Sequence, residues 1–584
     1  AVSCACLQVV LRYVFRSGLP WPEELATWVF VWAVFLGMAL ATGRDAHISI
    51  DVLLRALSAR GRFALELFNR AVMAAASIVL VIHGMDYVGR AIAASPALQW
   101  PMKYLFLAVP VGGALNLFFL VWPKAGRSLL QGVGILAGGA LIYLAVRYGA
   151  ASLYGGSGSA IVLILVGIVG IIIGVPVAFA LAFGAFAAFA PLSQILLVTI
   201  SQNMAASLNS FTLLAIPFFI LAAAVMNAGG ITPRLVDLAM QLVGHLRGGL
   251  GQANVVTNTM LAGVSGSSTA DASTIAKLLV PEMAKRGYSR PFGAALTAAS
   301  STLANLIPPS LGLIIYAALA SVSVGAIFVA TIVPGFLVAG ALMLMVYIMS
   351  RRRGYGGDIP KATLSQRMSS LGLAVPALLL PVLIVGGVRF GVFTATEAGA
   401  VAFVYALLCG ALLYRKLTPG NLLAAIRESV LDTAVIAIII AAAAPFAWVL
   451  AFEQVPQKIA QQLGTLVAQP VLLMLMINLF LLVVGLFMEM IASLVILVPI
   501  LVPLAIAAGV DPIHFGIIIV MNLVIGALTP PLGVLVFTTA RVGGANQTET
   551  FRAVLPFVLC LICVLMLVTF VPALSLLPVQ WFGP

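Results

Sequence analysis

The sequence predicts an all-α polytopic membrane protein, organised as an inverted repeat with two re-entrant helical hairpins and an additional N-terminal helical bundle. Three observations predict this fold. Apolar residues make up 63% of the 584 residues and charged residues only 8%, which leaves too little polar surface to face water. Long apolar stretches recur along the chain, and one set of motifs occurs twice in its second part.

The apolar stretches define the predicted helices in order. A helix needs about 20 mostly apolar residues to cross a bilayer. Spanning or half-spanning elements are predicted at roughly 25–43, 64–86, 102–122, 129–146, 160–190, 210–228, 311–349, 371–388, 393–414, 433–451, 471–488 and 553–577.

The net charge of +13 comes from basic residues scattered among loops rather than gathered on one face. This pattern argues against a nucleic-acid partner and is typical of loops that orient a membrane protein with its positive side in the cytoplasm. The cytoplasmic loops are predicted to hold Arg44, Arg55, Arg60 and Arg62; Lys124 and Arg127; Arg351, Arg352, Arg353, Lys361 and Arg367; and Arg415 with Lys416.

A Gly/Ser stretch from Tyr154 to Ser159 divides the chain in two, because such a composition forms flexible connectors. Residues 1–128 are predicted to form a helical bundle, 129–159 a connecting transmembrane helix and linker, and 160–584 the larger part, with repeats at about 160–350 and 371–584. Inside the bundle, the segment 44–62 mixes arginines with apolar residues and predicts a helix in the headgroup plane.

The repeat is the most informative feature. Pro281 and Pro503 are 222 positions apart, and at that offset Ser267 aligns with Glu489. Each proline precedes a Phe-Gly pair, an apolar helix and a double proline: Phe292-Gly293 with Pro308-Pro309, and Phe515-Gly516 with Pro530-Pro531. The first loop is basic (Lys285, Arg286, Arg290), whereas the second has Asp511 and His514 without Lys or Arg. The loops are therefore expected on opposite faces of the membrane, as in secondary transporters.

Polar or glycine-rich backbone interrupts the apolar pattern at 264–271, 300–305, 489–493 and 522–529. Such backbone cannot face lipid, because each unpaired polar group costs several kcal/mol there. Pro308 and Pro530 would free carbonyls upstream, and nearby hydroxyls would complete an oxygen shell suited to sodium. The helix starts after each break would favour a substrate carboxylate.

Simpler interpretations stay open for single residues. Ser265, Ser273, Ser300 and Ser301 are as well explained by bonds to nearby carbonyls as by ligation, and Asp271 by a helix cap as by a ligand. Glu489 lies in an apolar stretch, where an ionisable group is functional by default. Asp511 and His514 are best interpreted as capping and solvating their loop.

The sequence also predicts what drives the protein. The four histidines are dispersed, so no metal centre of histidine ligands is expected. No nucleophile–base pair or Walker motif occurs in the sequence, which predicts neither an enzyme nor an ATP-driven pump. An ion gradient is left as the energy source.

The motifs resemble those of tripartite ATP-independent periplasmic (TRAP) transporters in which the small and large membrane subunits are fused, the QM type. Residues 160–584 are similar to the large subunit and the N-terminal part to the small one. The resemblance rests on Leu214–Leu221, Gly263–Asp271, Leu306–Ser310, Asp511–Gly516 and Leu528–Pro531, and on Val10–Phe15, Leu19–Glu24 and His47-Ile48.

This resemblance implies a multi-pass protein of the bacterial inner membrane that imports a small organic acid by a sodium-driven elevator mechanism. The substrate would be a carboxylate such as a C4-dicarboxylate, keto acid or sialic acid, delivered by a periplasmic substrate-binding protein. The oligomeric state is left open. A stand-alone carboxylate carrier without a binding protein is the main alternative, and a membrane enzyme or scaffold is a second one.

The resemblance also suggests site residues. One sodium site would use Ser267, Ser268 and Thr269 with carbonyls near Asn305. The second would use Glu489, Ala492, Ser493, Gly526 and Thr529. Substrate contacts are expected from Ser265, Ser267, Asp271, Thr302, Ser310 and Asn522.

Overall fold

The computed structural model describes residues 2–13, 15–16, 18–50, 52–122, 128–149, 158–191, 194–356 and 359–581. Over these ranges the regular structure is helical, apart from one isolated bridge between Ala94 and Pro101. Twelve of the described helices are long and apolar enough to cross a membrane, which confirms the all-α polytopic prediction. Most of the predicted connector, residues 154–157, lies outside the described residues, as do Lys124 and Arg127.

The chain forms two compact units. The first consists of Ala1–Leu214, Glu428–Gln462 and Val495–Pro503, and the second of Ala215–Arg427, Leu463–Leu494 and Leu504–Pro584. Helices α21 (Pro419–Phe452) and α25 (Met490–Ala507) contribute residues to both units.

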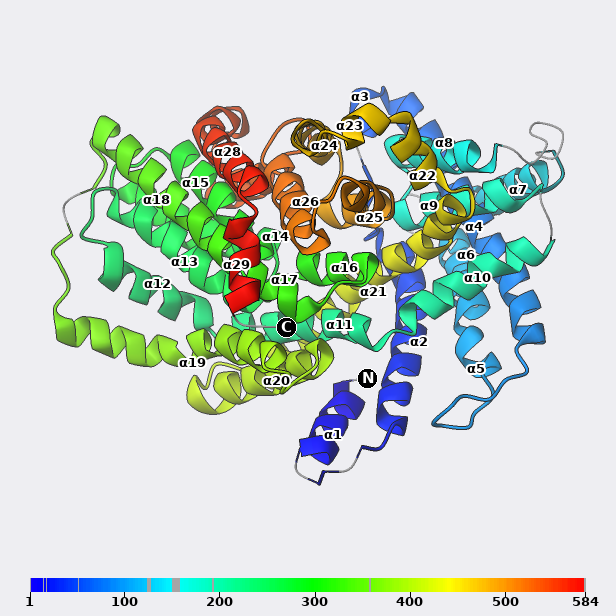
Figure 1. Ribbon diagram of the computed structural model, residues 1–584, viewed down its shortest axis with the longest axis horizontal. Coiled ribbons are helices and arrows are strands. Elements are labelled where there is room, and N and C mark those ends of the chain that lie inside the picture. The colour runs from blue at the N-terminus through cyan, green and yellow to red at the C-terminus, as the bar shows by residue number, and fades with distance from the viewer. Residues whose placement is uncertain are drawn as a thin grey trace. The chain divides into compact units, whose positions relative to one another are not determined.

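Helices of the first unit pack through small residues, as is usual for helices in lipid. A Cβ added to Gly112 of α6 would lie 2.7 Å from Cβ of Phe35 in α2, and one added to Gly139 of α7 would lie 2.6 Å from Cβ of Ala74 in α4. The helices of this unit (Figure 1) are α1 Val2–Tyr13, α2 Trp21–Arg44, α3 Val52–Ala56, α4 Ala59–Arg90, α5 Lys103–Phe106, α6 Ala108–Val121, α7 Leu129–Leu144, α8 Ser159–Ile172, α9 Val177–Phe189, α10 Gln194–Leu208 and α22 Val455–Gln462.

Two predictions for this unit are wrong. The stretch 160–190 forms two helices, because Gly174 adopts φ +93° and Pro176 precedes the start of α9. The N–H of Val177, the first residue of α9, donates to the Ile48 carbonyl at 3.0 Å. The segment 44–62 is not a single helix. Asp45, in the left-handed conformation, ends α2, and only the short α3 forms before Ser58 caps α4.

The second unit contains most of the repeat. Its helices are α11 Ala215–Ala228, α12 Ile231–Val243, α13 Gly249–Ser265, α14 Ser268–Lys285, α15 Arg290–Ser301, the 3-10 turn η4 Thr302–Asn305, α16 Leu311–Ala320, α17 Val324–Ala330, α18 Ile332–Arg353, α19 Leu364–Arg389, α20 Ala395–Leu408, α23 Gly464–Val467, α24 Pro470–Phe487, α26 Pro512–Gly526, α27 Val534–Gly543, α28 Gln547–Phe570 and α29 Ala573–Trp581, together with the ends of α21 and α25 (Figure 1).

Element boundaries follow the 222-residue offset. Helices α14 and α25 begin at Ser268 and Met490, and α15 and α26 begin at Arg290 and Pro512. The double prolines are both cis, and Gly287 and Gly509 adopt φ +80° and +77°. The two segments therefore have the same order of elements at the same spacing.

Three boundaries differ from the prediction. The stretch 311–349 forms α16, α17 and α18, and α16 ends because Ser321 is in the left-handed region and Ser323 caps α17. The stretch 553–577 is divided between α28 and α29. Helix α25 is long and apolar enough to span a membrane, although its residues were not among the predicted spans.

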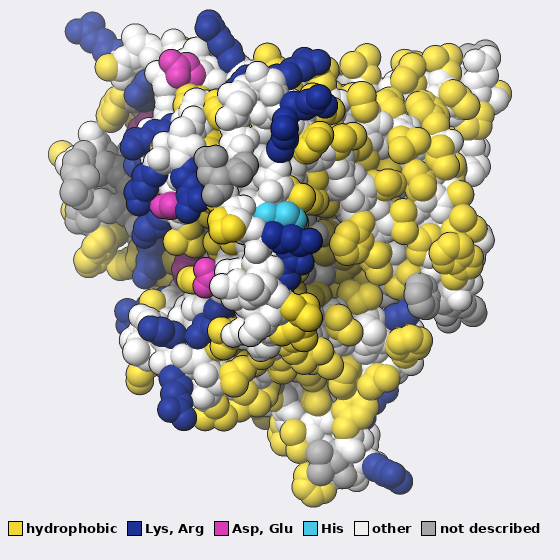
Figure 2. Space-filling model, turned by 90° about the vertical axis from the view of Figure 1, so that its left-hand side faces the viewer, with side chains coloured by type: hydrophobic (Ala, Val, Ile, Leu, Met, Phe, Trp, Pro, Cys, Tyr) yellow, Lys and Arg dark blue, Asp and Glu magenta, His cyan; other side chains and the backbone are white. Residues whose placement is uncertain are grey.

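Charge and apolar surface are separated on the face shown in Figure 2. Lys and Arg side chains gather on one side of this view, and hydrophobic side chains cover much of the other. This separation fits a protein whose apolar belt lies in lipid and whose basic residues lie in the aqueous or headgroup region.

Candidate functional site

The first tip, residues 265–268, joins α13 to α14. Gly266 adopts φ +62° and leaves only Ser267 before α14 begins. A Cβ at Gly266 would lie 2.6 Å from the carbonyl oxygen of Pro309. Glycine is therefore required twice here, for the left-handed backbone and for the close approach to the double-proline turn.

Polar side chains connect this tip to the turn. The Asn305 amide donates to Ser268 Oγ at 2.6 Å, and Ser310 Oγ donates to the Asn305 carbonyl at 2.7 Å. Ser267 Oγ and Thr269 Oγ1 are 3.3 Å apart. The structure thus brings together the predicted residues Ser267, Ser268, Thr269, Asn305 and Ser310.

Asp271 lies in the first turn of α14 and is fully buried. The Ser265 hydroxyl lies near the Asp271 carboxylate, but neither carboxylate oxygen accepts a well-formed hydrogen bond from the described residues. The cap interpretation is therefore wrong. A buried carboxylate of this kind is costly unless a positive charge or a proton compensates it.

Hydroxyls around η4 donate to carbonyls of their own helix. Ser301 donates to Ala298 at 2.8 Å and Thr302 to Ala299 at 2.6 Å. Ser300 belongs to a buried polar cluster, in which its Oγ donates to Asn254 Oδ1 at 2.9 Å and accepts from Asn258 Nδ2 at 2.8 Å. These contacts fit the simpler interpretation, in which hydroxyls join helices.

The second tip, residues 487–490, joins α24 to α25. Glu489 is the N-cap of α25, and its Oε2 accepts from the N–H groups of Ile491 at 2.8 Å and Ala492 at 3.3 Å. Ser493 Oγ donates to the Glu489 carbonyl at 2.9 Å. The carboxylate thus satisfies the start of its own helix, where the helix dipole favours negative charge.

The end of α26 packs on the second tip. Thr529 Oγ1 donates to the Gly526 carbonyl at 2.7 Å, and the Leu532 N–H donates to the Leu486 carbonyl at 3.2 Å. A Cβ at Gly485 would lie only 2.9 Å from Cα of Gly526. The predicted residues Gly526 and Thr529 therefore lie on the turn that is held against this tip.

Asn522 lies a full turn before the end of α26, and its amide group donates to Asn478 Oδ1 at 2.6 Å. Asn478 in turn donates to Thr569 Oγ1 at 3.2 Å. Asn522 thus makes a helix contact through its amide nitrogen, and the predicted substrate contact stays a prediction. Asn254, Asn258 and Asn478 were missed, although an amide inside an apolar stretch is itself a signal for such contacts.

The two tip-and-turn pairs are connected. A Cβ at Gly312, which follows the first double proline, would lie 2.9 Å from Cε of Met490 in the second tip. Tyr316 Oη of α16 donates to the Pro512 carbonyl at the start of α26 at 2.5 Å. Asp511 caps α26 through Ile513 N–H at 2.7 Å, which confirms its interpretation as a cap.

Two family models match the chain. Residues 1–129 match "Tripartite ATP-independent periplasmic transporters, DctQ component", and residues 163–574 match "Tripartite ATP-independent periplasmic transporter, DctM component".

Two relatives match 97% of the chain, and a third matches 70% of it. The isethionate TRAP transporter permease protein DctMQ of Oleidesulfovibrio alaskensis is 34% identical over 97% of this chain and 91% of the relative. The sialic acid TRAP transporter permease protein SiaT of Haemophilus influenzae is 33% identical over 97% and 94%. The sialic acid TRAP transporter large permease protein SiaM of Vibrio cholerae is 41% identical over 70% and 96%. Among solved structures, the YdaH transporter of Alcanivorax borkumensis, described as having an unusual topology, matches with a TM-score of 0.49 and 18% identity, over 67% of this chain and 91% of the other.

Proposed function

Because this chain belongs to the TRAP transporter family, with the small and large membrane components in one polypeptide, we propose that it couples sodium entry to import of a small organic anion. It is a transporter permease rather than an enzyme, and it resides as a multi-pass protein in the bacterial inner membrane. The proposal adds the coupling ion, the substrate class and the dependence on a periplasmic binding protein.

The observation that carries the proposal is the buried carboxylate of Asp271. Its oxygens lack well-formed hydrogen bonds from the described residues, and it follows Ser267 and Ser268 by about one helical turn, with Thr269 between them in sequence. A sodium ion among these oxygens would compensate the charge. We therefore assign Asp271 to the cation, because a second carboxylate placed directly beside it would be repelled.

The substrate anion is assigned to the start of α14 and the double-proline turn. Ser267, the N-cap of α14, makes no side-chain capping bond, so N–H groups of the first turn are available to an anion. Ser265, Thr302 and Ser310 lie on the same two segments. The expected cargo is a carboxylate such as a C4-dicarboxylate, keto acid or sialic acid, and the name of the isethionate relative adds a sulfonate to the panel to be tested.

A second sodium ion is assigned to the second tip. Its oxygens would come from Ser493, Thr529 and the Gly526 carbonyl, with Ala492 beside them. Glu489 uses Oε2 for its cap contacts, so its other carboxylate oxygen would be the one offered to the ion.

The test is sodium-driven uptake into proteoliposomes by the unaltered protein, Asp271→Asn and the control Asp237→Asn, whose side chain lies on the exposed side of α12. Since removing one partner of a buried charge pair costs about 3–5 kcal/mol, D271N should need at least about 100-fold more sodium for half-maximal uptake. D237N should behave as wild type. A D271N protein that elutes as a folded species and keeps wild-type sodium dependence would remove the cation assignment.

The stand-alone carrier is distinguished by the binding protein. Uptake of radiolabelled sialic acid, a C4-dicarboxylate and isethionate should require the cognate purified binding protein in the assay. Equal uptake with and without that protein would favour the stand-alone alternative, whereas substrate uptake that needs the protein but ignores a sodium gradient would refute only the coupling ion.

A further inference from the structure

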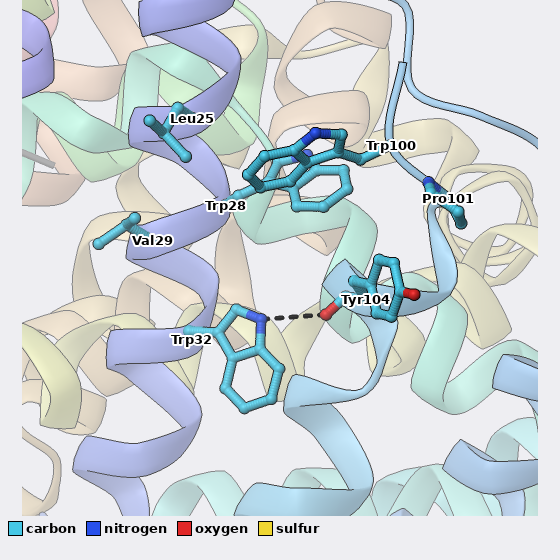
Figure 3. A pocket seen from close by; sticks show the side chains of 7 residues that line it. All are labelled: Leu25, Trp28, Val29, Trp32, Trp100, Pro101 and Tyr104. Atoms are coloured by element: carbon cyan, nitrogen blue, oxygen red, sulfur yellow. Dashed lines mark hydrogen bonds between the residues drawn. The ribbon is translucent and has the colours of Figure 1, made fainter. Parts of the chain in front are cut away.

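We propose that an aromatic pocket in the first unit binds one phospholipid from the outer leaflet of the inner membrane, with an acyl chain in the pocket and the phosphate at Lys103. The pocket has a volume of about 540 Å³, within the roughly 300–1,000 Å³ range of ligand pockets. Leu25, Trp28, Val29 and Trp32 of α2 form one wall, and Trp100 and Tyr104 form the other (Figure 3).

The pocket is held open by its own contacts. Glu24 Oε2 accepts from the N–H groups of Ala97 at 2.7 Å and Leu98 at 2.8 Å, which fixes the segment that carries Trp100. Trp28 and Trp100 meet edge to face with ring centroids 6.0 Å apart. Trp32 Nε1 donates to the Tyr104 carbonyl at 3.0 Å. Little reorganisation is therefore needed for a ligand to enter.

The depth of the pocket points to a membrane component. At 1.5 Å per residue, α2 is about 36 Å long, and Leu25 to Trp32 lie about 6 to 17 Å from its first residue. In a hydrocarbon core about 30 Å thick, this is the acyl-chain region of one leaflet. The end of α2 opposite the pocket carries Arg44 and leads to the basic loop expected in the cytoplasm, so the leaflet is the outer one.

The chemistry of the rim favours a phospholipid over other apolar molecules. Val29, Trp100 and Tyr104 are 42%, 50% and 49% exposed, so the pocket is continuous with the lipid-facing side of α2. Lys103 is exposed beside it, with Nζ 5.4 Å from the Tyr104 ring. The stem of a lysine extends along apolar surface toward the headgroup level, where its ammonium would pair with phosphate.

The test compares Val29→Trp, which fills the pocket, with Leu36→Trp on the same helix outside it. Both side chains are 42% exposed. After reconstitution in phosphatidylethanolamine–phosphatidylglycerol vesicles and extraction, native mass spectrometry should find one retained phospholipid on wild type and L36W. Retention should fall about tenfold in V29W, the effect of losing contact with roughly two methylene groups. Lys103→Gln should lower it less.

A second measurement uses the unaltered protein and does not depend on folding of a variant. Protein equilibrated with phosphatidylcholine brominated on its acyl chains is diluted into unbrominated micelles, so that surface lipid exchanges. Part of the tryptophan quenching should persist, and complete recovery of fluorescence would overturn the proposal. Equal lipid retention by V29W and L36W would also overturn the proposal. If V29W kept its lipid but lost affinity for the binding protein, the pocket would be a protein-docking site and the proposal would also be overturned.

Discussion

At the scale of single residues, the bond between Asn305 and Ser268 is the contact that joins the first tip to the double-proline turn. Ser268→Ala and Asn305→Ala remove the same bond, so their effects should not add. Each should raise the sodium concentration for half-maximal uptake by about fivefold, since a buried hydrogen bond contributes about 1 kcal/mol.

The control for this pair is Ser273→Ala in the same helix, because the Ser273 hydroxyl donates to its own helix at Ala270. It should keep wild-type sodium dependence. Strictly additive effects of S268A and N305A in the double variant would contradict a shared role.

Glu489 combines a cap with a charge, and the two roles can be separated. Glu489→Ala should lower the free energy of unfolding by about 1 kcal/mol, the usual effect of removing a helix cap. Glu489→Ser, which restores a capping oxygen, should unfold near the wild-type temperature, yet both variants should lose sodium-dependent uptake because the charge is gone. Wild-type sodium dependence in the serine variant would show that Glu489 acts only as a helix cap.

At the scale of helices, the crossing of α24 and α26 depends on Gly485. Gly485→Ala would place Cβ 2.9 Å from Cα of Gly526, a backbone contact that side-chain movement cannot relieve. The variant should lower the free energy of unfolding by about 1–3 kcal/mol, read as a lower melting temperature in detergent. The added Cβ of Gly372→Ala in α19 meets no atom within 4 Å, so this control should be neutral or stabilising by up to about 1 kcal/mol. An equal loss of unfolding free energy in both variants would show that the close contact between α24 and α26 is not the cause.

The sequence predicts the helices well where a long apolar run forms one uninterrupted helix. Turns inside such runs are not visible in the hydropathy pattern. Gly174 and Pro176 divide one run, and Ser321 and Ser323 divide another, because backbone conformation there overrides hydropathy. Helix α25 is not among the predicted spans, since a charged residue in an apolar stretch indicates a break in the helix. Glu489 is instead the N-cap of α25, and a charged cap is compatible with a long helix after it.

Part of the candidate site was also predictable. Clustered hydroxyls and paired prolines placed Ser267, Ser268, Asn305 and Ser310 together. Sequence could not show that Asn522 pairs with Asn478 or that neither Asp271 oxygen accepts a well-formed hydrogen bond from the part of the chain that the structure describes. Those facts depend on which neighbouring helix each side chain meets, and the spacing along one helix does not specify the neighbour.

At the scale of the whole molecule, the inverted orientation of the repeat is still a prediction and can be tested with matched positions. Lys285 and Ala507 are 222 residues apart, end α14 and α25, and are both exposed. In a background without the five native cysteines, Lys285→Cys and Ala507→Cys should react with a membrane-impermeant maleimide from opposite sides of intact vesicles. Labelling of both from one side would show that the repeat is not inverted.

The contact of Tyr316 with Pro512 bears on how uncoupled passage of the ion could be prevented. This phenol ties the helix after the first double proline to the helix before the second, and Gly516 leaves no room beside the same ring. The two proposed ligand clusters are thus joined through one helix contact. Under the proposed sodium-coupled mechanism, movement of one cluster would move the other, which would prevent sodium from crossing without its substrate.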